Sequence, residues 1–235
     1  MYHKLIYLIL YLFLSQVVYA QSVSKAKGTY DYLLFLPKDY AKQTATYPLV
    51  IYLHGGSQKG NDLNKLKLYG LPHLVDQGTD YPFIIASPQC PDNKYWSTEN
   101  WFENLYRDLR AKYRVDTNRV YVTGISMGGF GAWQVAMDYP NTFAAVIPLC
   151  GGCNDSTQIC RISHVPVWTF HGTADDQIPI SETERLINRL EKCNGKAKFT
   201  RLNGEGHSIQ YLYGNKVIFD WMLQQKRQPF TGSSR

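Results

Sequence analysis

A pentapeptide of the form G-x-S-x-G occupies Gly124–Gly128 and carries Ser126 at its centre. It follows the β-rich run Arg119–Thr123 and precedes a helical stretch, Gly129–Tyr139, which ends before Pro140. A strand-to-helix turn this tight holds its central residue in a strained conformation and needs glycine two positions to either side. Because the turn exposes the serine hydroxyl at the carboxyl edge of a sheet, Ser126 is predicted to be a nucleophile.

A serine hydroxyl becomes a good nucleophile when a base takes its proton and a carboxylate orients that base. His207 lies in a glycine-containing segment, 203–208, directly after the last β-rich run. Asp175 and Asp176 both follow an earlier run, and we predict that Asp175 is the partner of His207, with Asp176 as the open alternative. The chain order Ser126, Asp175, His207 is that of an α/β-hydrolase triad.

A third segment, Leu-His-Gly-Gly-Ser-Gln-Lys-Gly at 53–60, follows the most apolar run of the chain. Acyl transfer creates an oxyanion that needs two preorganised N–H donors. We predict the backbone N–H of Met127 as one donor and that of Gly56 as the other, since glycine lets the backbone approach a substrate closely. His54 is expected to brace this loop by hydrogen bonding. The order of lysine and glycine in the segment does not match a phosphate-binding loop.

These three segments need a scaffold of alternating strands and helices. Apolar, β-rich runs lie at Tyr30–Leu36, Leu49–Leu53, Phe83–Ser87, Val120–Thr123, Ala145–Leu149, Val165–Phe170 and Lys198–Leu202. Helical patterns lie between or after them, at 102–113, 129–139, 181–190 (opened by a capping box, Ser181-Glu-Thr-Glu184) and 217–222. The alternation predicts a single α/β domain, with a mostly parallel sheet of about seven to eight strands and helices on both faces. About fifteen residues separate the run at 145–149 from Val165, which leaves no room for a large lid.

The composition agrees with one globular domain. The chain has 235 residues, of which 44% are hydrophobic and 19% charged, and this balance argues against disorder. The formal net charge of +6 comes from 25 Lys and Arg against 19 Asp and Glu. Because no block of basic residues concentrates this charge, no nucleic-acid partner is predicted.

The first 20 residues are typical of a secretory signal peptide. Lys4 precedes an unbroken apolar run, Leu5–Leu14, and Val18-Tyr19-Ala20 fits the cleavage rule of small residues. An uncleaved membrane anchor is the alternative. We therefore predict a secreted or periplasmic catalytic domain at 21–235, with a disordered tail at 226–235 and no membrane span after cleavage.

The five cysteines of an exported protein can form disulfides. Cys153 and Cys160 flank a polar loop and are the predicted pair. No cysteines and histidines have zinc-ligand spacing, so no metal is predicted. The aromatic segment with Tyr95, Trp96 and Trp101 either packs a crossover onto the sheet or lines a pocket. Trp96, Trp101 and Gln58 are the candidate pocket residues.

In these motifs the chain resembles the α/β-hydrolase superfamily. Within it, the chain is similar to small esterases without a lid, a group that includes predicted peptidases and phospholipase/carboxylesterases, and to polyhydroxybutyrate depolymerases and feruloyl and acetyl-xylan esterases. The motifs that carry the resemblance are Phe35–Tyr40, Leu53–Gly56, Ser87–Pro91, Val115–Tyr121, Gly124–Gly129 and Val165–Gly172. The resemblance covers about residues 29–227 and implies the same triad and the same oxyanion donors. Many relatives carry a tryptophan shortly after the triad histidine, where this chain has Ser208–Tyr211.

The resemblance implies a secreted serine hydrolase that cleaves carboxylic esters through an acyl-enzyme, without a cofactor. The expected substrates are small-acyl or carbohydrate-linked esters, feruloyl or acetyl, free or attached to a polysaccharide. A serine peptidase acting on short peptides and an inactive binding protein on the hydrolase fold are the alternatives. A monomer or small homo-oligomer is expected.

Overall fold

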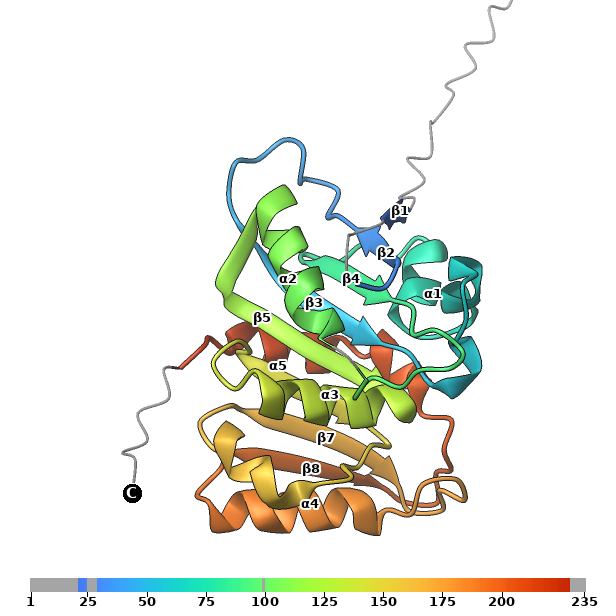
Figure 1. Cartoon of the computed structure of the whole chain (residues 1–235), viewed down its shortest axis with the longest axis vertical. Helices are drawn as coiled ribbons and strands as arrows, with labels where there is room; N and C mark the ends of the chain where they lie inside the picture. Colours follow the sequence, from blue (N-terminus) through green and yellow to red (C-terminus); the bar gives the residue numbers. More distant parts are fainter. Residues whose placement is uncertain (1–20, 25–28, 99, 229–235) are drawn as a thin grey trace, which may run out of the picture.

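The computed structural model describes residues 21–24, 29–98 and 100–228, so the predicted signal peptide and most of the predicted tail lie outside this part. Eight strands form one sheet in the order β1-β2-β4-β3-β5-β6-β7-β8 (Figure 1). Their bounds are β1 Ser22–Ser24, β2 Tyr32–Phe35, β3 Tyr47–Leu53, β4 Ile84–Pro88, β5 Val115–Ile125, β6 Ala145–Leu149, β7 Val167–Gly172 and β8 Ala197–Leu202. Strand β2 runs antiparallel to β1 and β4. The remaining neighbours in the sheet, from β4 through β3, β5, β6 and β7 to β8, pair in parallel. This sheet confirms the predicted α/β fold.

Helices cover both faces of the sheet, as predicted. They are α1 Leu71–Asp76, α2 Trp101–Lys112, α3 Met127–Asp138, α4 Ser181–Lys192 and α5 Lys216–Gln224. Helices α2, α3 and α4 pack into one hydrophobic core and α1 and α5 into the other, on the opposite side of the sheet. Figure 1 shows α3 in front of the strands, α5 behind them, and α4 below β8 at the bottom of the view.

The sequence missed α1 and misjudged the N-cap of α4. Helix α1 has six residues, too few for the helical period to stand out from a loop. Helix α4 begins at Ser181 itself, and its N-cap residue, Ile180, makes no side-chain capping bond. The predicted capping box is therefore wrong, because Ser181 lies inside the first turn and not before it.

Strand β3 and the second half of β5, which lead to the loop at 53–60 and to Ser126, are deeply buried. Every residue of β3 is buried, as expected for a central strand with helices on both faces. Strand β5 starts five residues earlier than its apolar run and has a partly exposed first half, where its pairing with β3 is irregular. From Val120 onward β5 is buried, and it delivers the G-x-S-x-G segment to the carboxyl edge of the sheet.

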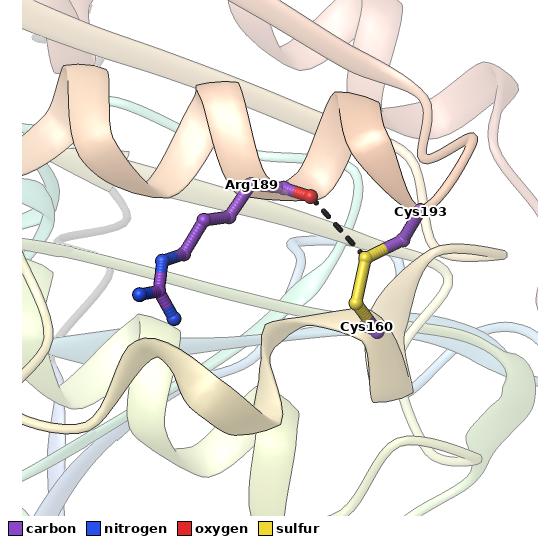
Figure 2. Close-up of a disulfide and its surroundings, with 3 residues drawn as sticks. All are labelled: Cys160, Arg189 and Cys193. Atoms are coloured by element: carbon purple, nitrogen blue, oxygen red, sulfur yellow. Dashed lines mark hydrogen bonds between the residues drawn. A yellow bond between two sulfur atoms is a disulfide. The ribbon is translucent and has the colours of Figure 1, made fainter.

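The disulfide joins Cys160 to Cys193, so the predicted pairing of Cys153 with Cys160 is wrong (Figure 2). Cys160 lies in a 3₁₀ helix, Ser156–Ile162, and Cys193 directly follows α4. This 3₁₀ helix packs against α4, which brings the two Cα atoms to 5.5 Å. Cys153 is instead a buried free thiol, 3.1 Å from the carbonyl oxygen of Asp155.

The connection between β6 and β7 contains only loop and the 3₁₀ helix Ser156–Ile162, in agreement with the predicted lack of a large lid. Three further 3₁₀ helices lie at Gly56–Gln58, Leu63–Leu68 and Gln210–Gly214. Within the described ranges, none of the helices has both the length and the apolar character that a membrane span requires.

Candidate active site

Ser126 lies between β5 and α3 with φ 58° and ψ −122°, a backbone conformation that residues other than glycine rarely adopt. Such a conformation costs on the order of 1–3 kcal/mol and persists only where the surroundings impose it. Here the flanking glycines allow the close approach of α3 to β3. A Cβ at Gly124 would lie 2.3 Å from the carbonyl oxygen of Gly128, and a Cβ at Gly128 would lie 1.9 Å from that of Leu53.

His207 and Asp175 are in contact, as the sequence predicted. The Nδ1 atom of His207 lies 2.8 Å from Oδ2 of Asp175. Asp175 follows β7 and His207 follows β8, and these neighbouring parallel strands bring both loops to the edge of the sheet that holds Ser126. The side chain of Asp175 is fully buried, whereas that of His207 is 12% exposed. Asp176 is exposed.

The environment of Asp175 stabilises its charge. Burial by itself raises the pKa of this carboxyl, but hydrogen bonds from the backbone N–H of Ile178, from His207 and from the N–H of Gln177 lower it below its ordinary value. Both backbone donors reach Oδ1, at 2.9 Å and 3.0 Å, which leaves Oδ2 for His207. Asp175 is therefore an ionised, preorganised acceptor at neutral pH.

A second histidine, which the sequence analysis did not single out, stands behind Asp175. His171 is fully buried, and its Nε2 lies 3.2 Å from Oδ2 of Asp175 and 2.9 Å from the carbonyl oxygen of Ile178. Because both neighbours only accept hydrogen bonds, Nε2 must carry the proton. The Nδ1 atom lies 2.8 Å from Oγ1 of Thr183, which also lies 2.6 Å from the carbonyl oxygen of Gly151. The signal in the sequence was a histidine, His171, directly after the apolar run 165–170.

His54 braces the loop after β3, which confirms its predicted role. Its Nε2 accepts a hydrogen bond from the backbone N–H of Cys90, and its Nδ1 donates to the carbonyl of Gly55. Burial lowers the pKa of His54 to about 4, so this imidazole is neutral at physiological pH. The indole of Trp96 donates to the carbonyl of His54 and joins the loop to the aromatic segment.

Two cavities meet at Ser126. We call the first, of about 390 Å³, the apolar cavity, because its lining includes the side chains of Tyr95, Trp96, Met127, Phe130 and Ile178. The second, of about 380 Å³, is here called the polar cavity. It holds His207 together with Gly56, Ser57, Tyr69, Gln177 and Gln210.

Two of the three predicted pocket residues lie elsewhere. Gln58 is fully buried, and its amide donates to the carbonyls of Lys65 and Leu66, so its chemistry is used to hold the loop. The indole of Trp101 donates to the carbonyl of Trp96 and stacks on Tyr30, which makes it a core residue of the crossover. Trp96 does line the apolar cavity, as predicted.

The predicted oxyanion donors both border the cavities. Met127 is the first residue of α3, where backbone N–H groups have no partner within the helix, and it lines the apolar cavity. Gly56 lines the polar cavity, and the space beside its Cα is open to 4 Å. Gly55 comes closer to the serine, since a Cβ placed on it would lie 3.6 Å from the Cβ of Ser126.

The model of the dienelactone hydrolase family matches residues 94–214, just over half of the chain, including Ser126, Asp175 and His207. The chain belongs to this family.

Curated relatives of this chain include proteins with esterase and depolymerase names, and others with dipeptidyl-peptidase names. The chain is similar to the bifunctional acetylxylan esterase/xylanase XynS20E of Neocallimastix patriciarum, with 26% identity over 67% of this chain and 23% of the relative. Poly(3-hydroxyalkanoate) depolymerase C of Paucimonas lemoignei is 30% identical over 57% of this chain and 34% of its own length. Feruloyl esterase D of Neurospora crassa is 28% identical over 70% of this chain and 59% of its own length. The chain thus spans less than two thirds of each relative.

Solved structures agree on the fold. The crystal structure of a thermostable esterase superposes with a TM-score of 0.73 at 31% identity, covering 88% of this chain and 63% of that chain. A ferulic acid esterase superposes with a TM-score of 0.65 at 18% identity, covering 86% of this chain and 95% of that chain. The thermostable esterase is also similar in sequence, whereas the ferulic acid esterase shows the fold alone.

One group of side chains in the described part of the chain has the composition of a metal site. The ligand atoms of Cys150, His171 and Asp175 all lie within 4.8 Å of one another. However, His171 and Asp175 already use these atoms in hydrogen bonds, and burial raises the pKa of the Cys150 thiol, which keeps it protonated. The group is better described as a hydrogen-bonded support for the carboxylate.

Proposed function

We propose that this protein is an exported serine hydrolase that cleaves carboxylic esters with Ser126 as nucleophile, His207 as base and Asp175 as the orienting acid. The observation that carries the proposal is the 2.8 Å contact of His207 with a buried carboxylate, beside a cavity that also contains Ser126 on its strained turn. The names of the relatives support ester cleavage as the reaction.

In the proposed first step, the unprotonated Nε2 of His207 takes the proton of Ser126 as Oγ attacks the ester carbonyl carbon. Asp175 accepts the Nδ1–H bond, which fixes the tautomer that leaves Nε2 free, and it stabilises the imidazolium that forms. His207 then donates the proton to the departing alkoxide, and an alcohol leaves. Water repeats the attack on the acyl-enzyme and releases the acid.

The negative charge that develops on the carbonyl oxygen is held by the backbone N–H groups of Met127 and Gly56. The helix α3 adds the positive end of its dipole at the same place, since Met127 is its first residue. Removing one donor of an oxyanion hole costs roughly 10²–10³ in rate. The reaction needs no metal or cofactor.

The proposed substrates are small-acyl or carbohydrate-linked esters, such as acetyl or feruloyl esters of a polysaccharide. The two cavities at Ser126 support an ester with a sizeable group on each side. Export is proposed from the signal-like pattern at 1–20, together with the disulfide between Cys160 and Cys193, a bond that persists in oxidising compartments.

A fluorophosphonate probe tests the nucleophile. We expect the mature protein to be labelled and the Ser126→Ala variant to remain unlabelled, because the probe reacts only with an activated serine. Labelling of both proteins would contradict the proposal. Asp175→Asn should slow labelling by at least about 10³-fold, as expected when the base adopts the wrong tautomer. Asp176→Asn is the matched control and should label at the wild-type rate.

A substrate panel separates esterase from peptidase. Methyl and p-nitrophenyl esters, acetylated xylan and aminoacyl-nitroanilides would be compared on the same preparation. We expect turnover of the esters, and turnover of the anilides alone would replace the proposal with a peptidase.

A further inference from the structure

We infer that the hydroxyl of Tyr69 holds the oxyanion loop, the segment Gly55–Ser57, by contacting the residues on both sides of Gly56, and that Tyr69 is therefore a positioning residue for ester cleavage. This inference rests on the proposed function, because it takes the backbone N–H of Gly56 as a donor to the carbonyl oxygen. It goes beyond that function, since neither the sequence pattern nor the proposed mechanism gives Tyr69 a role.

Gly56 has little of its own to fix its orientation. It is exposed, and apart from its chain neighbours no heavy atom lies within 4 Å of a Cβ built on it. It also begins the 3₁₀ helix Gly56–Gln58, where the first N–H groups have no partner within the helix. Because an oxyanion donor must point to the place where charge develops, the direction of this N–H matters for the rate. That direction depends on the neighbours of Gly56, which are Gly55 and Ser57.

The hydroxyl of Tyr69 reaches both of these neighbours. Its oxygen lies 2.9 Å from Oγ of Ser57, which is hydrogen-bond distance. On the other side, a Cβ placed on Gly55 would lie 3.0 Å from the same oxygen, so the hydroxyl fills the space that a side chain at this position would need. Burial raises the pKa of Tyr69, although hydrogen bonds with Ser57 and with the backbone N–H of Gly55 oppose this shift. The phenol therefore stays protonated at neutral pH and bridges residues 55 and 57.

Tyr69 is itself anchored to β3, the strand that leads into the loop. The next residue, Gly70, has φ 78° and lies so close to Tyr52 of β3 that an added Cβ would be 1.9 Å from the hydroxyl oxygen of Tyr52. The carbonyl oxygen of Tyr69 lies 3.5 Å from Nε2 of Gln58, at the end of the 3₁₀ helix. The half-buried ring of Tyr69 packs against the core that contains α1 and α5. The hydroxyl is thus presented to the loop from a fixed frame.

The bridge lies beside the nucleophile. Tyr69 and Ser57 line the polar cavity, which Ser126 also borders. The Cβ position of Gly55 spans the gap, since it lies 3.0 Å from the hydroxyl of Tyr69 and 3.6 Å from the Cβ of Ser126. A hydroxyl at this place either holds the loop or binds the substrate, and kinetics separate the two roles. Loss of a hold on the loop weakens only the transition state and lowers kcat, whereas loss of a substrate contact raises KM.

Tyr69→Phe tests the inference, because it keeps the ring and removes only the hydroxyl. We expect kcat to fall by ~10- to 100-fold with KM within ~3-fold, a smaller loss than that of a whole oxyanion donor, since Gly56 is displaced and not removed. The pH at which kcat/KM is half-maximal should not change, because His207 and Asp175 are untouched. The Ki of phenylboronic acid, whose tetrahedral adduct with a serine places an oxygen in the oxyanion site, should rise by the factor by which kcat/KM falls.

Ser57→Ala removes the other half of the bridge at an exposed position and should lower kcat by ~3- to 10-fold. The double variant should be no slower than Tyr69→Phe alone, because the two groups act through one contact. Tyr52→Phe is the matched control. Its buried hydroxyl has no hydrogen-bond partner among the described residues, so its loss should leave kcat within ~2-fold of wild type.

A wild-type kcat in Tyr69→Phe, a rise of KM at constant kcat, or additive losses in the double variant would overturn the inference while the esterase proposal stands. Absence of ester turnover together with absence of Ser126 labelling in the wild-type protein would instead contradict the proposed function. Thermal unfolding reports whether Tyr69→Phe is folded. If it is not, Ser57→Ala carries the same test through kcat and the Ki of the boronic acid.

Discussion

At the scale of single residues, Asp175 is a buried carboxylate whose two oxygens both have hydrogen-bond partners. Its Oδ1 accepts two backbone N–H groups, and its Oδ2 lies between the imidazoles of His207 and His171. A carboxylate that is held on both oxygens cannot rotate away from the base. This arrangement explains how a loop residue can hold the orientation that the proposed reaction needs.

His171 is therefore expected to act as a positioning residue. His171→Leu removes the Nε2–H donor, and we expect kcat to fall by about 10- to 100-fold with KM nearly unchanged, since a small misplacement of the base affects only the chemical step. His171→Gln places an amide donor near the same point and should recover part of the loss. The measurement is steady-state kinetics on one ester.

His164→Leu is the control for this prediction. His164 also contacts a backbone carbonyl, that of Pro140, but it precedes β7 at the far end of the sheet from the candidate site. Its loss should leave kcat within ~2-fold of wild type. An equal fall of kcat in the His171→Gln and His171→Leu variants would show that the side chain only fills space.

At the scale of elements, the strained turn exists because α3 packs directly on β3 and β5. The glycines at 124 and 128 remove the two side chains that would hold these elements apart. The N–H of Ser126 also donates to the carbonyl of Leu149 in the next strand, β6, which ties the turn to the sheet. The exposure of Ser126 is thus imposed by its neighbours.

Gly128→Ala tests this packing. Its Cβ would lie 1.9 Å from the carbonyl oxygen of Leu53, a backbone atom of the central strand, so either α3 or the turn must move. We expect the free energy of unfolding in urea to fall by at least about 1–3 kcal/mol, and probe labelling of Ser126 to slow. Gly214→Ala is the control, because no heavy atom lies within 4 Å of its added Cβ. Similar effects of both changes would refute the packing argument.

At the scale of the whole molecule, the disulfide fastens α4 to the connection between β6 and β7. Cys160 and Cys193 are 33 residues apart, and closing a loop of that length in the unfolded chain contributes ~3–4 kcal/mol. Helix α4 also supplies Thr183, the hydroxyl beside His171. The bond therefore stabilises the part of the domain that supports Asp175.

Reduction of this disulfide should lower the melting temperature by roughly 6–16 °C, since about 1 kcal/mol corresponds to ~2–4 °C in a domain of this size. Thermal unfolding with and without dithiothreitol measures the shift. Cys193→Ser should abolish the dependence on reductant, whereas Cys153→Ser should preserve it. The reverse pattern would restore the pairing that the sequence suggested.

The sequence by itself determined the class of fold and the chain order of the candidate catalytic residues. Buried parallel strands leave nearly continuous apolar runs, and a tight strand-to-helix turn leaves its glycines, so both features are local and can be recognised without a structure. The loop after β3 was recognised for the same reason, including the bracing role of His54.

Only the tertiary structure decided which side chains meet. The pairing of Cys160 with Cys193 depends on how α4 packs against a 3₁₀ helix, and the roles of Gln58 and Trp101 depend on which carbonyls lie beside them. The contact of His171 with Asp175 and the division of the site into two cavities arise in the same way. These are contacts between segments far apart or in folded-back loops, and composition and periodicity carry no record of such distances.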